Sequence, residues 1–180
     1  TRDYTFPMGH VQLLGKSDKD QISPDAPFFT PGRMLSEMAA HSIDWWFTGE
    51  DLPDADNRVT IENGQIHLDY NENNTEGFRR LIHTWKHVLS GLDSGHELLP
   101  HSMYLSKDIP LAGVAHQAGT LRFGNDPDSS VLDTHCKTHE IENLYVVDGS
   151  FFPSIGAVNP SLTIMANALR VGDHLAGLLK

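Results

Sequence analysis

The chain has 180 residues, of which 39% are hydrophobic, a composition ordinary for one folded domain with a single core. It carries 13 Lys and Arg against 24 Asp and Glu, and the formal net charge of -11 excludes a typical nucleic-acid-binding protein, which needs clustered basic residues. Cys136 is the single cysteine, so no internal disulfide can form, and a disulfide-stapled secreted module is excluded.

The first part of the chain is predicted to hold short strands, a loop and one helix. Residues 1–32 are rich in Pro, Gly and Asp, and their apolar residues offer possible strand positions at Phe6, Val11, Leu13 and Leu14. Residues 33–47, RMLSEMAAHSIDWWF, contain good helix formers, and Gly49 follows as a stop signal. We therefore predict a helix over 33–47.

Residues 58–70, RVTIENGQIHLDY, have the pattern of a β-hairpin. Apolar residues alternate with polar ones on both sides of Asn63-Gly64: Val59 and Ile61 before it, and Ile66, Leu68 and Tyr70 after it. Asn-Gly is the pair that favours a turn with positive φ at both central residues. The sequence therefore predicts two strands joined at this pair.

Helical periodicity is clearest in two further segments. TEGFRRLIHTWKHVLSG, residues 75–91, spaces its large apolar residues for one helix face and ends in Gly. A last helix is predicted over 160–178, with one face that holds Leu162, Met165 and Leu169. NLYVVDGS, residues 143–150, is predicted to contain a short strand. Helices that alternate with hairpins indicate an α+β domain, in which a mostly antiparallel sheet packs helices on one side.

The uncharged run from Gly149 to Leu169 is long enough to cross a bilayer, but it contains residues that are costly in hydrocarbon: Pro153, Asn159, Pro160 and Asn167. We interpret this run as buried protein interior. We expect a soluble protein, with a cytoplasmic location favoured although no residue assigns a compartment. The chain opens TRDYTFPMG, without Met or a signal-like leader, so we expect a fragment or subunit of a larger protein.

Eleven His residues raise the alternative of a metal protein. His83 and His87 are four positions apart on a predicted helix, and HCKTH brings together His135, Cys136 and His139. Neither set has the complete ligand pattern of a structural zinc site. We therefore predict no metal, and a solvated or interface His is the simpler interpretation.

Three residues are candidates for chemistry on their local sequence. His116 precedes Gly119, which allows close backbone approach, although a neutral His is also a common structural residue. Asp148 ends an apolar stretch, where it can meet a ribose hydroxyl or a pyrophosphate-bound water, and the alternative is an Asx-turn. Asn159 is in the first place a helix N-cap before Pro160.

Three motifs in the second half of the chain resemble the C-terminal part of the glucose-methanol-choline (GMC) oxidoreductases, flavoenzymes that oxidise alcohols and sugars. They are HQAGTLRFGNDPDSSVLD, NLYVVDGSFFPS and NPSLTIMANALRVGDHL. EDLPDADNRVTIENGQIHLDYNENN resembles the preceding, substrate-side stretch of the same family. The resemblance implies a substrate-side region, 1–109, and a segment, 110–180, that carries the catalytic residues and completes an FAD-binding domain.

The resemblance also implies roles for single residues. His116 and Asn159 are expected to face the flavin from the substrate side as the catalytic pair. Asp148 and Gly149 are expected to approach the ribityl and pyrophosphate part of FAD, and the isoalloxazine is expected to be approached by Asn159, Pro160 and Thr163. No G-x-G pattern occurs in the chain, so the FAD-binding N-terminal half is expected outside it, in the same gene product or in a separate chain.

The reaction implied by the resemblance is oxidation of a small alcohol or sugar. His116 takes the hydroxyl proton while hydride moves to N5 of FAD, and Asn159 holds the same oxygen. A helix that begins at Asn159-Pro160 directs a positive dipole end at the flavin. Without the FAD-binding half, we expect exposed apolar surface around Phe151, Phe152 and the Asn159 loop.

The alternative is a non-catalytic binding or partner-stabilising module that keeps the same fold but has lost its own flavin. A His-based metal protein is a third possibility, and it predicts bound zinc. Neither a nucleic acid nor a membrane is expected as a partner, because the chain is acidic and its long uncharged run contains Pro and Asn.

Overall fold

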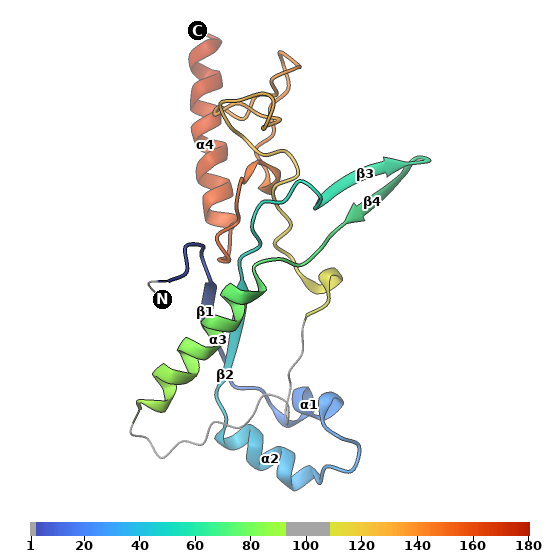
Figure 1. The fold of residues 1–180 in the computed structure, drawn as a ribbon, viewed down its shortest axis with the longest axis vertical. Helices are drawn as coiled ribbons and strands as arrows, with labels where there is room; N and C mark the ends of the chain where they lie inside the picture. The colour runs from blue at the N-terminus through green and yellow to red at the C-terminus, as the bar shows by residue number, and fades with distance from the viewer. Residues whose placement is uncertain (1–2, 93–108) are drawn as a thin grey trace.

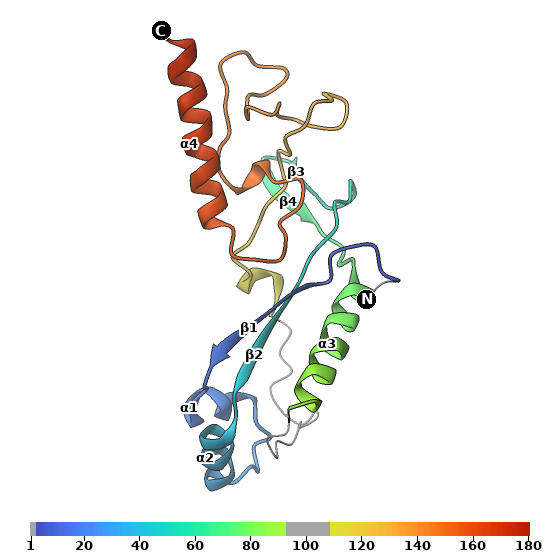
Figure 2. The ribbon, with the colours of Figure 1, turned by 90° about the vertical axis from the view of Figure 1, so that its left-hand side faces the viewer.

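A computed structural model of the chain describes residues 3–92 and 109–180. The molecule is elongated, with helices α1 (Lys19–Ile22) and α2 (Gly32–His41) at one end and α4 (Ser161–Leu178) at the other (Figures 1 and 2). The strands of the described residues form two separate two-stranded antiparallel sheets. The α+β class is confirmed, and its antiparallel pairing is divided between these two small sheets.

The first sheet pairs β1 (Gly9–Gly15) with β2 (Asp44–Gly49), and α3 (Thr75–Ser90) packs against both strands (Figure 2). Trp85 of α3 meets Trp45 of β2 nearly edge to face, with ring centroids 4.7 Å apart at 65°. The predicted helix at 75–91 is confirmed as α3. Strand β1 contains the predicted positions Val11, Leu13 and Leu14, whereas Phe6 lies before it.

The helix predicted over 33–47 is wrong in its second half. Helix α2 ends at His41, and the chain then enters β2. Residues 45–48 are three aromatic residues and one β-branched residue, Trp-Trp-Phe-Thr, which fit a pleated and half-buried surface. Each of them pairs in register with a residue of β1. Pairing with a distant strand outweighs the local helix propensity on which the prediction depended.

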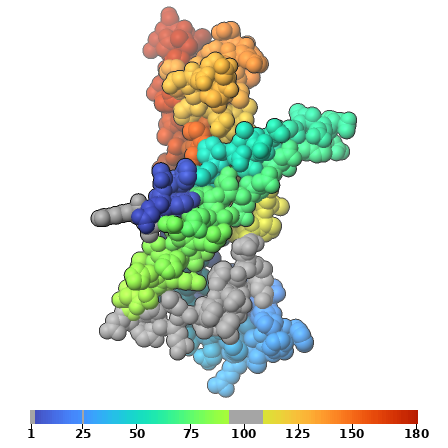
Figure 3. Space-filling view, in the orientation of Figure 1, coloured from blue at the N-terminus to red at the C-terminus, as the bar shows by residue number. Residues whose placement is uncertain are grey.

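The predicted hairpin is confirmed. Strand β3 (Arg58–Glu62) pairs with β4 (Gln65–Asp69), and the turn residues Asn63 and Gly64 both have positive φ, 52° and 78°. One face of the hairpin is aliphatic and exposed, with Val59 opposite Leu68 and Ile61 opposite Ile66. In the space-filling view the hairpin projects from the side of the molecule (Figure 3).

A small core lies between α1 and α2. Asp18 accepts hydrogen bonds from the first amides of α1 in a capping box with Gln21, and a 3-10 turn, η1 (Ser23–Asp25), follows the helix. The buried residues of this core are Ile22, Leu35 and Ala39.

The opposite end of the molecule is built around α4, with a second core formed by Leu132, Cys136, Phe151 and Val171. Turns and isolated bridges take the place of strands here, including the 3-10 turns η3 (Leu111–Gly113) and η4 (Gly149–Phe151). The strand predicted within 143–150 is not formed, and Tyr145 makes a single bridge with Lys137. The neighbouring Cys136 has a φ of 61°, and this sharp turn interrupts any longer ladder.

The predicted C-terminal helix is confirmed as α4. It packs through Val171, Ile164 and Leu175 against the second core, whereas its other side exposes Leu162, Met165 and Leu169. These three residues share one side as predicted. The interpretation of the run as buried interior is confirmed at Phe151 and Ala157 and is wrong at Leu162, Met165 and Leu169. None of the described helices is long and apolar enough to span a membrane.

Candidate active site

Two segments run side by side and bring the candidate site residues toward one another. Three alternate backbone amides within residues 119–123 donate to the carbonyl oxygens of residues 149–151, at N to O distances of 3.3, 3.0 and 3.0 Å. His116 lies shortly before the first segment, and Asp148 lies directly before the second. These three bonds hold the chain over 119–123 in a fixed register against the 3-10 turn η4.

Gly149 lies where these segments meet α4. A Cβ at this position would be 3.1 Å from the Gln117 carbonyl oxygen and 3.6 Å from Cδ1 of Ile164. The first of these distances is tighter than ordinary van der Waals contact, so a larger residue would push the two segments apart. Glycine at 149 therefore sets the spacing between the chain that follows His116 and the first turns of α4.

Asp148 is exposed and forms the N-cap of η4. Its Oδ1 accepts a hydrogen bond from the Ser150 amide at 2.8 Å, and this bond lowers the pKa of the carboxyl from its usual value. The Asx-turn alternative is therefore present in the structure. The carboxylate is ionised at neutral pH.

Asn159 is exposed, and it does not cap α4. The cap position is Pro160, with φ -88° and ψ -11°, and no side chain bonds to the first-turn amides. The predicted N-cap is wrong because the backbone already turns in the helical sense at Pro160, whose carbonyl oxygen accepts from the Ile164 amide at 3.0 Å. Among the described residues, the Asn159 side chain has no hydrogen-bond partner.

The amino end of α4 keeps unsatisfied N–H groups as a result. Thr163, in this first turn, is exposed, and no side chain closes the helix end. The N-terminus of a helix of 18 residues carries about half of a positive charge and favours an anion or an electron-rich edge. This is the electrostatic character that the sequence predicted for the region, without the contribution from an Asn159 cap.

The chain before Asn159 makes a tight turn. Gly156 and Ala157 have φ of 74° and 53°, and Ala157 is 2% exposed. A non-glycine residue in this left-handed region is strained, and it persists here because the surrounding structure buries it. The position of Asn159 is therefore set by a tightly packed turn.

His116 is half-buried, and its ring has no hydrogen-bond partner in the described part of the chain. No hydrogen bond joins it to Asn159 within residues 3–92 and 109–180. The structure brings the chain after His116 and the first turns of α4 together at Gly149.

Comparison with known proteins decides the family. The family profile described as GMC oxidoreductase matches residues 6–168. The chain belongs to the GMC oxidoreductase family. Its resemblance to that family in the three sequence motifs is thereby confirmed.

Several characterised proteins are similar to this GMC oxidoreductase chain. The 6'''-hydroxyparomomycin C oxidase of Streptomyces lividus is 48% identical over 68 residues, which cover 36% of this chain and 12% of that protein. The 2-methyl-1,2-propanediol dehydrogenase of Mycolicibacterium austroafricanum is 48% identical over 61 residues, 34% of this chain and 11% of that protein. The fructose dehydrogenase large subunit of Gluconobacter japonicus is 28% identical over 161 residues, 83% of this chain and 28% of that protein.

The chain spans only a small part of these relatives, at most 28% of their length in the three matches. The described residues of this GMC oxidoreductase chain fit one side of a flavin site, because the uncapped start of α4 offers N–H donors beside the exposed Asn159 and Thr163. The sequence contributes no Gly-rich phosphate loop.

The apolar surface expected around Phe151 and Phe152 is wrong for Phe151. The Phe151 ring is 3% exposed and stacks on Phe123 and Phe152, with centroids 5.6 and 4.3 Å apart. It belongs to the core of the GMC chain itself and needs no partner to cover it. Val158, next to Asn159, is exposed as expected.

The residues considered as metal ligands have separate partners. The Cys136 sulfur is buried and accepts from the Asn167 side chain at 3.3 Å, and His139 Nε2 lies 3.0 Å from the Ser130 hydroxyl. His135 instead stacks on His174, with centroids 3.8 Å apart. Within the described residues, no group of three or more His, Cys, Asp or Glu side chains is placed to hold a metal.

Sequence reasoning missed a polar contact of a buried carboxyl group near this site. The Ser154 hydroxyl donates to the carboxylate of Glu50, which lies far away in the sequence, directly after β2. Neither residue belongs to a pattern that could have indicated the contact. A buried Glu is recognised only once the fold is known.

Proposed function

We propose that this chain is the C-terminal, substrate-side part of an FAD-dependent oxidoreductase that oxidises a CH–OH group of an alcohol or sugar. The observation that supports this most is the placement of the His116 segment beside the amino end of α4, with Gly149 between them. From these two places a base and an amide can act on one hydroxyl. Relatives named for a propanediol and for fructose support this substrate class.

His116 is the proposed catalytic base. A neutral imidazole offers one ring nitrogen with a free lone pair, which can take the proton of the substrate hydroxyl. Asn159 is the proposed second catalytic residue, because its amide can donate a hydrogen bond to the same oxygen without competing for the proton. Bound FAD supplies the acceptor for the hydride.

The other residues of the site are proposed to hold the cofactor. Asn159, Pro160 and Thr163 surround the uncapped start of α4, which favours negative charge near the isoalloxazine. The ionised Asp148 can accept from a ribose hydroxyl or a bound water. Gly149 is proposed to lie beside the same part of FAD through its backbone, because its side-chain position is closed by Gln117 and Ile164.

The proposed partner is the FAD-binding N-terminal half, in the same gene product or in a separate chain. Residues 1–109 then form the substrate-side region, and residues 110–180 complete the cofactor site. The exposed aliphatic side of α4 suits burial against that half.

Stopped-flow reduction of the flavin in the full-length protein, with a panel of alcohols and sugars at several pH values, tests the proposal. We expect His116→Ala to slow reduction by about 10²- to 10⁴-fold and to remove the rise in rate that a His base gives with pH. Asn159→Ala should also slow reduction but keep the pH profile. Because Asn159 does not cap α4, this variant should leave the free energy of unfolding within about 0.5 kcal/mol.

His83→Ala, at an exposed His on α3, is the matched control and should reduce flavin at the wild-type rate. A wild-type rate and an unchanged pH profile in His116→Ala would show that His116 is not the base. A full-length protein that binds FAD but is reduced by no alcohol would instead favour a non-catalytic module of the same fold.

A further inference from the structure

A buried carboxyl group outside the proposed catalytic pair links the two described stretches of the chain. Glu50, directly after β2, is 5% exposed, and its carboxylate accepts a hydrogen bond from the Ser154 hydroxyl. Among the described residues, this is the one hydrogen bond or ion pair that joins residues 3–92 to residues 109–180. Burial of a carboxyl group is costly unless it is hydrogen-bonded, so the bond from Ser154 stabilises Glu50 in this position.

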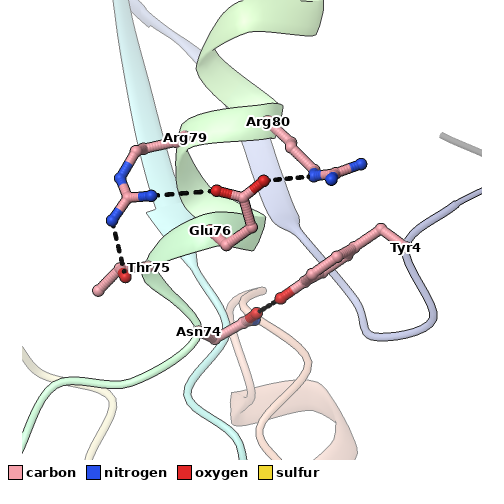
Figure 4. Close-up of polar contacts among 6 residues, drawn as sticks. All are labelled: Tyr4, Asn74, Thr75, Glu76, Arg79 and Arg80. Carbon is pink, nitrogen blue, oxygen red and sulfur yellow. Dashed lines mark hydrogen bonds and ion pairs between the residues drawn. The ribbon is translucent and has the colours of Figure 1, made fainter.

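The backbone at Glu50 is held by Asn74, the residue before α3. The Asn74 amide nitrogen donates to the carbonyl oxygens of Glu50 and Pro7, at 2.7 and 2.8 Å. Its side-chain oxygen accepts from the Tyr4 hydroxyl (Figure 4). A Cβ at Gly77 would lie 2.5 Å from that oxygen, so glycine leaves the room that the Asn74 amide occupies.

Two further Asn side chains hold the loop that follows Glu50. Asn73 accepts from the Leu52 amide at 2.8 Å and donates to the Leu52 carbonyl oxygen at 2.9 Å. Asn57 makes the same pair of bonds with the backbone of Asn71, at 2.6 and 3.0 Å. These bonds tie the loop after β2 to the chain that enters α3, and they give Glu50 a fixed position relative to the first sheet.

Ser154 lies on the other side of the link, in the turn that leads to Asn159. Gly156 and Ala157 in this turn have positive φ, and Ala157 is buried. Such a turn has few alternative conformations, because left-handed backbone and burial must be satisfied together. A hydrogen bond that holds Ser154 in place therefore also holds the position of Asn159, which follows this turn.

We propose that Glu50 is a positioning residue for the oxidation reaction. By accepting the Ser154 hydrogen bond, it holds the turn over 153–158 and so aligns Asn159 with His116 over one substrate hydroxyl. The required property is the acceptor oxygen and not the charge, because the role is alignment and involves no proton transfer. The catalytic consequence rests on the proposed function, whereas the physical link between the two stretches does not.

The test uses the full-length flavin-loaded protein with Glu50→Ala, Glu50→Gln, Ser154→Ala and the double variant Glu50→Ala with Ser154→Ala. Glu62→Ala, at the end of β3, is the control for an exposed carboxyl group. For each variant, two quantities are measured: the rate of flavin reduction at saturating alcohol, and the alcohol concentration that gives half of this rate. Hydrogen exchange reports the backbone amides of residues 154–159.

We expect Glu50→Ala and Ser154→Ala to slow reduction by about 10- to 100-fold, with half-saturation changed by less than about 2-fold, because alignment and not substrate binding is lost. The double variant should be no slower than the slower single variant, because both remove the same bond. Glu50→Gln, which keeps an acceptor oxygen, should remain within about 3-fold of wild type. Exchange over 154–159 should rise in the two Ala variants and stay unchanged in Glu62→Ala.

Wild-type reduction rates in Glu50→Ala and Ser154→Ala would overturn the positioning role, and additive losses in the double variant would overturn the shared bond. A Glu50→Gln variant as slow as Glu50→Ala would show that the charge is needed, which also contradicts the proposal. If Glu50→Ala fails to fold, the reduction rate of Ser154→Ala, which removes one hydroxyl, decides whether the positioning role is correct. If wild type is reduced by no alcohol, the proposed function fails, while the exchange comparison still decides whether the link exists.

Discussion

Residues 3–92 and residues 109–180 are stabilised in different ways. In the first stretch, backbone hydrogen bonds are collected in two strand pairs and in α3, and Asn side chains tie the loops between these elements. In the second stretch, α4 is the one long element described, and the other backbone bonds are single bridges and turns around the core of Leu132, Cys136, Phe151 and Val171.

This difference shows how the chain presents its candidate site residues. His116, Asp148 and Asn159 all lie in irregular segments, where the backbone can turn sharply and place a side chain that a ladder could not. Irregular segments have few cooperative backbone bonds, so their geometry depends on core packing and on close backbone approach. The first stretch should therefore tolerate local changes that the second does not.

The largest expected effect on stability comes from the second core. Phe151→Ala should lower the free energy of unfolding of the full-length protein by about 3–5 kcal/mol, because a buried, stacked ring is removed. Urea unfolding measures this free energy. In hydrogen exchange, the amides of residues 119–123 should lose protection under milder conditions than the amides of β1 and β2. Phe28→Ala, at a fully exposed ring, is the control and should stay within about 0.5 kcal/mol. A loss below about 1 kcal/mol in Phe151→Ala would contradict the dependence on this core.

A smaller effect is expected where the two segments approach α4. Gly149→Ala should destabilise the protein by about 1–3 kcal/mol and slow flavin reduction, because the new Cβ meets the Gln117 carbonyl oxygen at 3.1 Å. Gly172→Ala, inside α4 with no atom within 4 Å of the added Cβ, is the matched control. It should stabilise the helix by about 0.5–1 kcal/mol. Equal effects of the two substitutions would show that the spacing at Gly149 is not constrained.

The smallest effect concerns Asp148 and depends on pH. Asp148→Ala should cost about 1 kcal/mol at neutral pH, because the bond to the Ser150 amide is lost. This bond lowers the pKa of the folded-state carboxyl, so its contribution is present above the ordinary Asp value of about 3.9 and is lost as the pH falls through the lower folded value.

Urea unfolding at several pH values from about 2 to about 7 measures this dependence. The difference in the free energy of unfolding between wild type and Asp148→Ala should become smaller below about pH 4. Asp148→Asn, which keeps an acceptor but does not titrate, should not show the same narrowing against Asp148→Ala. A gap that widens on acidification would contradict the assignment of the pKa shift to the Ser150 bond.

Local patterns in the sequence determined several elements of this protein. The Asn63-Gly64 turn and the alternation around it produced the hairpin, because both strands and the turn lie within one short segment. The periodicity of 75–91 and of 160–178 produced α3 and α4 for the same reason. The three motifs also carried the family resemblance, since they are read directly from residue order.

Tertiary structure decided the features that depend on residues far apart in the chain. Residues 44–47 became part of a strand because β1 offered a partner, and Phe151 became core because Phe123 and α4 cover it. The approach of the His116 segment to α4 depends on three separate segments that meet at Gly149. The Glu50 to Ser154 bond likewise forms only when β2 and the Asn159 turn are packed together, and no local propensity contains that contact.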